Sequence, residues 1–259
     1  MKKPVVIIGI GEIGGVFARG FLKLGHPLHP VNRNDSMDAI ATNVTDPQLV
    51  VVAVGEKDLH PTLERLPAAW RDRLVLIQNE LLPRDWQRHR IDNPTVISVW
   101  FEKKPGMDAK VVVSSPVFGP HADTVIAALQ AVGLPAHRVA DQEALRFELV
   151  RKNLYILTTN IGGLAIGGGS VTELWHDHNE LARAVAADVL TIQRWLTGET
   201  LDDARLIDAM VTAFEGDPEH GCMGRSAPAR LERALTIANE AGLQVPTLQR
   251  IAAEHSAAA

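Results

Sequence analysis

The sequence predicts an α/β protein in which a doubly wound, mostly parallel sheet is followed by an all-helical domain. Apolar strand-like runs alternate with helix-like segments as far as about residue 140, as expected where helices cover both faces of a parallel sheet. From residue 141 onward only helix-period segments remain. A glycine-rich turn between the first strand and the first helix is the third observation. We therefore expect one domain over residues 1–140 and a second over residues 141–259.

The strands are expected in apolar or β-branched runs and the helices in segments with a 3.6-residue period. We expect strands at 5–8, 27–31, 46–54, 73–78, 95–101, 110–114 and 137–139, and helices at 12–24, 58–66, 121–132, 142–161, 179–196, 203–214, 229–241 and 247–254. Only about fifteen residues separate Arg33 from the strand at Val50, so any element between them must be short or absent. Glycines at 162–163 and 167–169 are expected to break the long helix.

The turn after the first strand has the pattern of a dinucleotide-binding loop. Gly9, Gly11 and Gly14 form a G-x-G-x-x-G motif, with an apolar strand before it and a helical pattern after it. Gly9 permits the tight turn, Gly11 lets the backbone approach a pyrophosphate, and Gly14 lets the helix pack closely on the strand. The motif predicts a Rossmann-like domain. The alternative is a glycine-rich turn that binds no ligand.

The residues around this loop indicate which dinucleotide is bound. The unpaired N–H groups of Glu12 and Ile13, at the start of the helix, are expected to face the phosphates. The second strand ends at Asn32 and Arg33, where an NAD-binding domain usually has Asp or Glu. The planar guanidinium of Arg33 can hold a 2′-phosphate, whereas Asp35 lies past the strand end. We therefore expect NADP(H). The alternative is a solvated arginine in a turn.

Composition restricts the partners and the compartment. The chain has 26 Lys and Arg against 31 Asp and Glu, so nucleic acid is not an expected partner. No apolar run is long enough to span a membrane, and the chain opens on a strand rather than on a signal peptide. The single cysteine, Cys222, excludes an internal disulfide and suits the cytoplasm. His176 and His178 lack a third ligand, so no metal site is expected. The alanine-rich helical domain makes a homodimer plausible.

Polar residues interrupt the apolar helix expected at 142–161. Lys152, Asn153, Ile156 and Asn160 fall within one arc of about 100°. A buried lysine or asparagine is costly unless it has a partner or a ligand. One reading is a carbonyl-reduction site, in which Lys152 donates a proton and Asn160 or Asn153 orients the substrate. The other is a lysine that extends to solvent and asparagines that bond to neighbouring backbone. Spacing alone leaves both open.

Several segments resemble one enzyme family, and together they cover nearly the whole chain. They are the loop at 9–14 with Gly25-His26, the strand at 46–54, Gln78-Asn79, the helix with Arg151-Lys152, Cys222-Met223 and the segment 242–246. These segments are similar to the ketopantoate (2-dehydropantoate) reductases, NADPH-dependent members of the 6-phosphogluconate-dehydrogenase-like group. The resemblance implies that Lys152 matches the catalytic lysine and Asn160 a conserved asparagine. It also implies that Asn79 lies beside the nicotinamide.

The substrate half departs from the pattern of that family. Ile156 stands where the family has an asparagine, Gly55 replaces a lysine, Glu80 a glycine and Cys222 a serine. The substrate-binding glutamate has no clear match: residues 226–228 occupy its place, and Glu232 is displaced from it. These changes predict a substrate other than ketopantoate. Two residues of the same segment are further candidates.

Those candidates are Arg225 and Ser226. Arg225 could hold a substrate carboxylate or could be a surface residue, and Ser226 could contact the substrate or cap the following helix. We therefore predict an NADP(H)-dependent oxidoreductase that transfers hydride to the carbonyl or imine carbon of a small, 2-keto-acid-like molecule. Two alternatives stay open: reduction of ketopantoate itself with the help of Glu232, and a non-catalytic NADP(H)-binding or scaffold protein.

Overall fold

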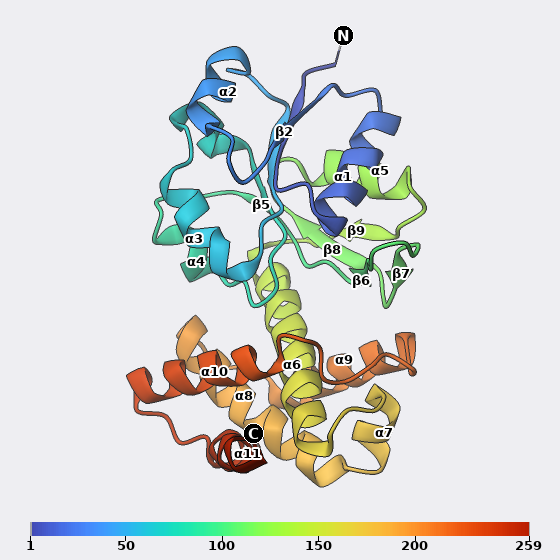
Figure 1. Cartoon of the computed structure of the whole chain (residues 1–259), viewed down its shortest axis with the longest axis vertical. Helices are drawn as coiled ribbons and strands as arrows, with labels where there is room; N and C mark the ends of the chain where they lie inside the picture. Colours follow the sequence, from blue (N-terminus) through green and yellow to red (C-terminus); the bar gives the residue numbers. More distant parts are fainter. Residues whose placement is uncertain (1, 259) are drawn as a thin grey trace. The chain divides into compact units, whose positions relative to one another are not determined.

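The computed structural model describes residues 2–258 of the chain. The chain forms two compact units, Met1–Leu149 and Val150–Ala259. The first unit is an α/β unit built on one sheet and the second contains only helices, which confirms the predicted fold class (Figure 1). The division between them falls inside the helix α6 (Gln142–Ile166).

The sheet of the first unit has seven strands, in the order β2-β1-β3-β4-β5-β8-β9. They are β2 (Leu28–Val31), β1 (Val5–Ile8), β3 (Leu49–Val52), β4 (Leu74–Leu76), β5 (Thr95–Ile97), β8 (Ser115–Phe118) and β9 (Ala136–Arg138). The first five strands are parallel; β8 is antiparallel to β5, and β9 is parallel to β8. Every residue of β1, β3 and β4 is buried, as expected for the middle of a sheet covered on both faces.

Helices cover the two faces of this sheet (Figure 1). On one face lie α1 (Glu12–Lys23) and α5 (Ala122–Gln130), whose apolar residues form a core with the strands. On the other lie α2 (Met37–Asn43), α3 (Glu56–Glu64), the 3₁₀ helix η1 (Ala68–Arg73) and α4 (Pro83–Gln87). The helices α1 and α5 approach each other closely at Gly20, where a Cβ would collide with the backbone of Ala128.

Two elements of the first unit differ from the expectation. The strand predicted at 95–101 is divided: it leaves the sheet after β5 and continues as β6 (Phe101–Glu102), which pairs with β7 (Lys110–Val111) in a hairpin. The strand predicted at 110–114 is this β7, and the chain returns to the sheet one segment later as β8. Apolar residues continue through all these positions, so the pattern could not show where the chain leaves the sheet. In addition, α2 occupies the short interval after β2.

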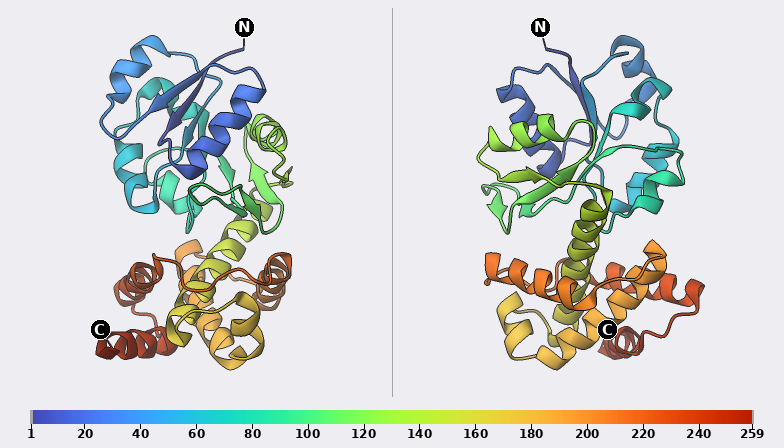
Figure 2. Two further views of the ribbon diagram at one scale, coloured as in Figure 1. Left: turned by 45° about the vertical axis from the view of Figure 1, so that its right-hand side comes forward. Right: turned by 180° about the vertical axis from the view of Figure 1, so that it is seen from behind.

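The second unit contains most of α6, followed by α7 (Val171–His176), α8 (Asn179–Thr197), α9 (Asp203–Gly216), α10 (Ala227–Ala241) and α11 (Pro246–Ala258). The helix α8 contacts α7, α10 and α11 (Figure 2). His176 is the last residue of α7. None of the helices in residues 2–258 is long and apolar enough to cross a membrane.

The predicted end of α6 is wrong by five residues. The helix continues through Gly162 and Gly163 to Ile166, and it ends only where Gly167 adopts a φ of 80°. A Cβ on Gly163 would lie 2.6 Å from the Cβ of Cys222, and a Cβ on Gly162 would press on Leu174. These two glycines therefore serve close packing within the helical unit. A glycine pair in a sequence does not show whether it ends a helix or lets another segment approach it.

Candidate functional site

The three glycines of the loop after β1 have different roles in the structure. Gly9 has a φ of 93°, and a Cβ there would lie 2.8 Å from the carbonyl oxygen of Ala53. A Cβ on Gly14 would collide with the carbonyl oxygen of Gly9. The fold itself thus requires both residues. At Gly11 a Cβ would meet no atom within 4 Å, so packing within the chain does not explain this glycine. The close approach of a ligand to the backbone would explain it.

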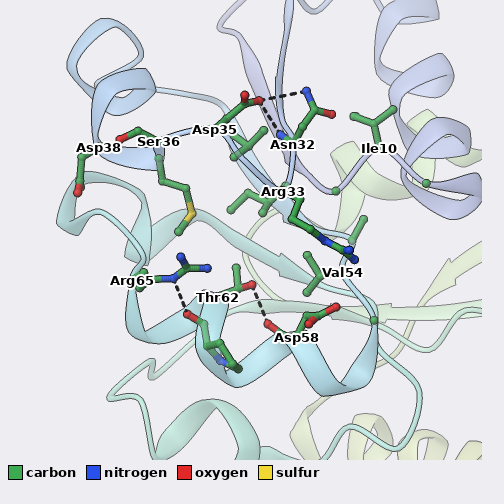
Figure 3. A pocket seen from close by; sticks show the side chains of 18 residues that line it. Ile10, Asn32, Arg33, Asp35, Ser36, Asp38, Val54, Asp58, Thr62 and Arg65 are labelled. Carbon is green, nitrogen blue, oxygen red and sulfur yellow. Dashed lines mark hydrogen bonds between the residues drawn. The ribbon is translucent and has the colours of Figure 1, made fainter.

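A cavity of about 550 Å³ lies beside this loop (Figure 3). Its walls are the loop itself, the segment 31–38 after β2, the end of β3 and one side of α3. Cavities of this size commonly bind cofactors and other small molecules. It is also at the carboxyl end of the parallel strands, where open α/β sheets bind their ligands.

Arg33 is exposed and reaches across this cavity in the direction of Val54 (Figure 3). The carboxylate of Asp35, which also lines the cavity, is engaged with Asn32: its Oδ2 accepts hydrogen bonds from the backbone N–H (2.7 Å) and side-chain amide (3.0 Å) of that residue. Within the described part of the chain, no hydrogen bond or ion pair engages Arg33. The guanidinium is therefore available to an anion, and Asn32 shapes the turn that carries it.

A second arginine lines the same cavity and was not among the expected residues. Arg65 follows α3, and its Nε donates to the carbonyl oxygen of Pro61 at 3.2 Å. Asp58 and Thr62 lie on the same side of α3, and the Thr62 hydroxyl donates to the Asp58 carbonyl oxygen at 2.7 Å. The helical spacing of these residues was a readable signal, but only the structure shows that their side of α3 faces the cavity.

The start of α1 is joined to a distant segment. The carboxylate of Glu12 lies 3.1 Å from Nζ of Lys103, a mostly buried lysine that follows β6. The neighbouring Ile13 packs against the apolar core that α1 and α5 form with the sheet. No local pattern marks Lys103, because it lies 91 positions after Glu12 in the chain.

Polar side chains also gather where β3 and β4 end. The side-chain amide of Asn79 donates to Oε1 of Glu56 at 3.1 Å, and Gln78 donates to the carbonyl oxygen of Val52 at 2.7 Å. The next residue, Glu80, has a φ of 59°, in the left-handed region where an L-residue is disfavoured. The family resemblance predicts a glycine here, and glycine is the residue that adopts this backbone conformation most readily.

In the helical unit, Lys152 lies on α6 and is partly buried. Its Nζ is 5.8 Å from the centre of the Tyr155 ring. Burial lowers the pKa of Lys152 to about 7, and the positive charges of Arg230 and Arg151 contribute to the same shift. An amine with this pKa exchanges its proton readily near neutral pH.

Asn160 lies two turns further along α6, and both the oxygen and the nitrogen of its amide make hydrogen bonds within the helical unit. Its Oδ1 accepts hydrogen bonds from Nη1 of Arg230 (3.0 Å) and from the backbone N–H of Gly224 (3.2 Å). Its Nδ2 donates to the carbonyl oxygen of Ile156 at 2.8 Å. Asn160 therefore connects α6 to the segment before α10 and to a guanidinium that sequence reasoning missed. Arg230 is 70 residues away, and no local pattern marks it.

The other expected residues of the helical unit are Asn153, Arg225 and Ser226. Asn153 is 1% exposed, and its amide donates to Oε1 of Gln193 in α8 at 3.1 Å, so this amide already has a partner within the helical unit. Arg225 and Ser226 are exposed in the turn before α10. Ser226 is the N-cap residue of α10, but its hydroxyl makes no capping hydrogen bond. No group of three or more metal-binding side chains occurs in residues 2–258.

No protein-family model matches the chain, and no curated protein is similar enough to match it. Solved structures do match over almost the full length. A ketopantoate reductase from Ralstonia eutropha is 16% identical, with a TM-score of 0.67 over 99% of this chain and 97% of that one. The 2-dehydropantoate 2-reductase of Methylococcus capsulatus is 13% identical, with a TM-score of 0.70 over 98% of this chain and 96% of that one. The chain has the fold of the ketopantoate reductases.

A D-mandelate dehydrogenase solved with NADH has this fold too. It is 13% identical to this chain, with a TM-score of 0.68 over 99% of both chains. The resemblance read from the sequence is thereby confirmed at the level of the fold. The similar proteins are reductases and dehydrogenases that act on different substrates, so the fold does not identify the substrate of this chain.

Proposed function

We propose that the chain is an NADP(H)-dependent oxidoreductase that reduces the carbonyl or imine carbon of a small, 2-keto-acid-like molecule. The observation that carries the proposal is the partly buried amine of Lys152, whose pKa of about 7 suits a proton donor at neutral pH. The fold supports it, since the solved structures that share it are reductases and dehydrogenases.

The residues of the first unit fit a dinucleotide. The open side of Gly11 admits a pyrophosphate, and the start of α1 offers the N–H groups of Glu12 and Ile13 to it. In this proposal Arg33 holds the 2′-phosphate, which distinguishes NADP(H) from NAD(H), and Asn79 contacts the nicotinamide. A bound nicotinamide would supply the hydride.

Lys152 completes the reduction by moving a proton. Its ammonium donates to the carbonyl oxygen as negative charge develops there, and the neutral amine then takes a proton from solvent. Near pH 7 both forms of Lys152 are populated, because its pKa is about 7. The expected departure from the family pattern, with Ile156 and no matching glutamate, supports a substrate other than ketopantoate.

We further propose a cytoplasmic homodimer. A ketopantoate reductase of Staphylococcus aureus with this fold, 17% identical and with a TM-score of 0.63 over 98% of both chains, is described as dimeric.

Cys222 is buried, and burial raises the pKa of its thiol to about 12, so it is not a reactive nucleophile.

The proposal is tested by measuring NADPH oxidation against a panel of 2-keto acids, with wild type, Lys152→Ala and the exposed control Lys104→Ala. We expect turnover of at least one acid, reduced about 100-fold or more by Lys152→Ala and unchanged by Lys104→Ala. If NADPH binds and no acid is reduced, the chain is a binding or scaffold protein instead. Turnover that survives Lys152→Ala would show that another group donates the proton.

A further inference from the structure

Arg230 lies on α10, one turn after the helix begins, and its guanidinium is fixed by a contact across the helical unit. Nη1 donates to Oδ1 of Asn160 at 3.0 Å. The same oxygen also accepts from the backbone N–H of Gly224, so Asn160 holds both the arginine and the turn that leads into its helix. Asn160 itself is 9% exposed and anchored to α6 by its own hydrogen bond to Ile156.

The segment that leads to Arg230 is closely attached to α6. The backbone N–H of Cys222 donates to the carbonyl oxygen of Gly169 at 2.8 Å, and Gly163 lets Cys222 and Met223 approach α6. Met223 has a φ of 58°, an uncommon conformation for a residue with a side chain. The chain thus holds this turn in place at some conformational cost, which is typical of functional sites.

The charge of Arg230 acts on Lys152. After burial, Arg230 is the strongest of the causes that lower the pKa of Lys152. The fold therefore places a guanidinium and a titrating amine within electrostatic range of each other, in a partly buried part of the molecule. Such a pair suits a molecule that has a carboxylate next to a carbonyl group, since guanidinium matches carboxylate geometry and an amine can protonate the carbonyl oxygen.

We propose that Arg230 binds the carboxylate of the substrate, and that Asn160 is a positioning residue that holds the Arg230 guanidinium. The choice of a 2-oxo carboxylate rests on the proposed function. In this arrangement the substrate must carry a charged carboxylate beside the carbonyl group, and the corresponding ester or amide is rejected. Asn160 acts through Arg230, because its amide oxygen already accepts two hydrogen bonds, one of them from Arg230, and its Nδ2 already donates to Ile156.

The first test uses binding without turnover. Oxamate, a stable carboxylate analogue of a 2-oxo acid, is titrated calorimetrically into the whole protein, with and without NADPH, and its neutral amide oxamide serves as comparison. We expect oxamate to bind and oxamide not to bind. Arg230→Gln should weaken oxamate binding about 100-fold, Arg230→Lys less, and Asn160→Ala about tenfold. The exposed control Arg250→Gln should bind like wild type.

The second test measures the effect of Arg230 on Lys152 directly. Acylation of Lys152 by acetic anhydride is followed by mass spectrometry as a function of pH. Removing the charge in Arg230→Gln should move the titration of Lys152 to higher pH, whereas Arg230→Lys and Arg250→Gln should not. A purely structural role for Arg230 would not predict this pattern.

The outcomes separate this inference from the proposed function. Oxamate binding that depends on Arg230, in a protein that reduces no 2-keto acid, would overturn the proposed function and support the carboxylate site. Failure of wild type to bind oxamate, or equal binding by wild type and Arg230→Gln, would overturn the role of Arg230 even if turnover is found. If the Lys152 titration is unchanged in Arg230→Gln, the charge of Arg230 does not lower the pKa of Lys152.

Discussion

Lys152 is the residue on which the proposed chemistry depends, and its lowered pKa gives a pH prediction. Burial and then the charge of Arg230 lower the pKa to about 7, so the ammonium form is lost as pH rises through this value. Only the ammonium can donate a proton, and kcat/KM for reduction should therefore fall above about pH 7.

The matched variant is Lys152→Arg, whose guanidinium does not titrate in this range. It should be slower than wild type and should show no fall in rate near pH 7. The measurement is kcat/KM for NADPH-dependent reduction from pH 5.5 to pH 9. A wild-type profile that is flat over this range, or that rises with pH, would contradict the role of Lys152 as proton donor.

The glycines of the loop give a second prediction at the scale of single residues. Gly11→Ala should leave the stability of the protein unchanged, because a Cβ there meets no atom of the chain, but it should weaken NADPH binding. Gly14→Ala should lower the unfolding midpoint, because a Cβ there collides with the Gly9 carbonyl oxygen. Unfolding curves and NADPH titrations of both variants provide the check. Normal NADPH binding by Gly11→Ala would show that no ligand approaches this backbone.

Some site residues could be predicted from the sequence because their signal is local. The glycine loop and Arg33 follow strands at standard offsets, and Lys152 stands out as a charge within an apolar helix. Arg230 gave no such signal, because only the folded helical unit brings it to Asn160. The partner of Asn153 in α8 could not be predicted either, because helical spacing does not show which helix packs against this face.

At the scale of elements, α3 connects the cavity to a pair of histidines. Pro61 and Thr62 face the cavity. His60 points from another side of α3, and its Nδ1 lies 2.9 Å from Nε2 of His89, in the segment after α4. One N–H between two neutral rings makes this hydrogen bond, whereas two imidazolium rings would repel each other. Asp85 lies 3.8 Å from the other side of the His60 ring.

The surroundings of the pair disfavour its charged form. Burial, followed by the charge of Arg88, lowers the pKa of His60 below its ordinary 6.5, and Glu64 opposes this shift. Burial also lowers the pKa of His89, followed by the charges of His60 and Arg88; Arg71 acts in the same direction and Glu64 against it. As pH falls below about 6.5, the unfolded chain therefore takes up protons first, and the folded state loses stability.

We accordingly expect the first unit to be less stable at pH 5 than at pH 7, with a smaller loss in His89→Gln than in wild type. His137→Gln, which changes an exposed histidine on β9, is the control and should keep the wild-type dependence. Thermal unfolding midpoints at the two pH values measure the effect. An equal loss in wild type and His89→Gln would show that the pair does not couple protonation to stability.

An element could be predicted from the sequence where its signal is local, and could not where it depends on contacts with distant segments. The parallel strands β1, β3 and β4 are continuous apolar runs, and their positions could be read directly. The hairpin β6–β7 and the antiparallel return through β8 depend on pairing between segments, which the apolar pattern does not encode. The continuation of α6 through Gly162 and Gly163 depends on what packs against them.

At the scale of the whole molecule, the two units differ in how closely their sequences follow the pattern of the ketopantoate reductases, whose fold they share. The first unit has the glycine loop, the arginine after β2 and the asparagine after β4, which the proposed function assigns to the cofactor. The helical unit keeps Lys152 and Asn160 but offers Arg230 in a region where the family pattern leads one to expect a glutamate. Under the proposed function, this difference corresponds to the same type of reaction on a different substrate.

The most direct test of the central claim is a calorimetric titration of the whole protein with NADPH and, separately, with NADH. We predict tight binding of NADPH, weaker binding of NADH, and loss of the difference in Arg33→Ala, because the exposed guanidinium faces the cavity. If NADH binds as tightly as NADPH, Arg33 does not select the cofactor. If neither nucleotide binds, the chain is not a nicotinamide-dependent oxidoreductase, and its glycine loop is a structural turn.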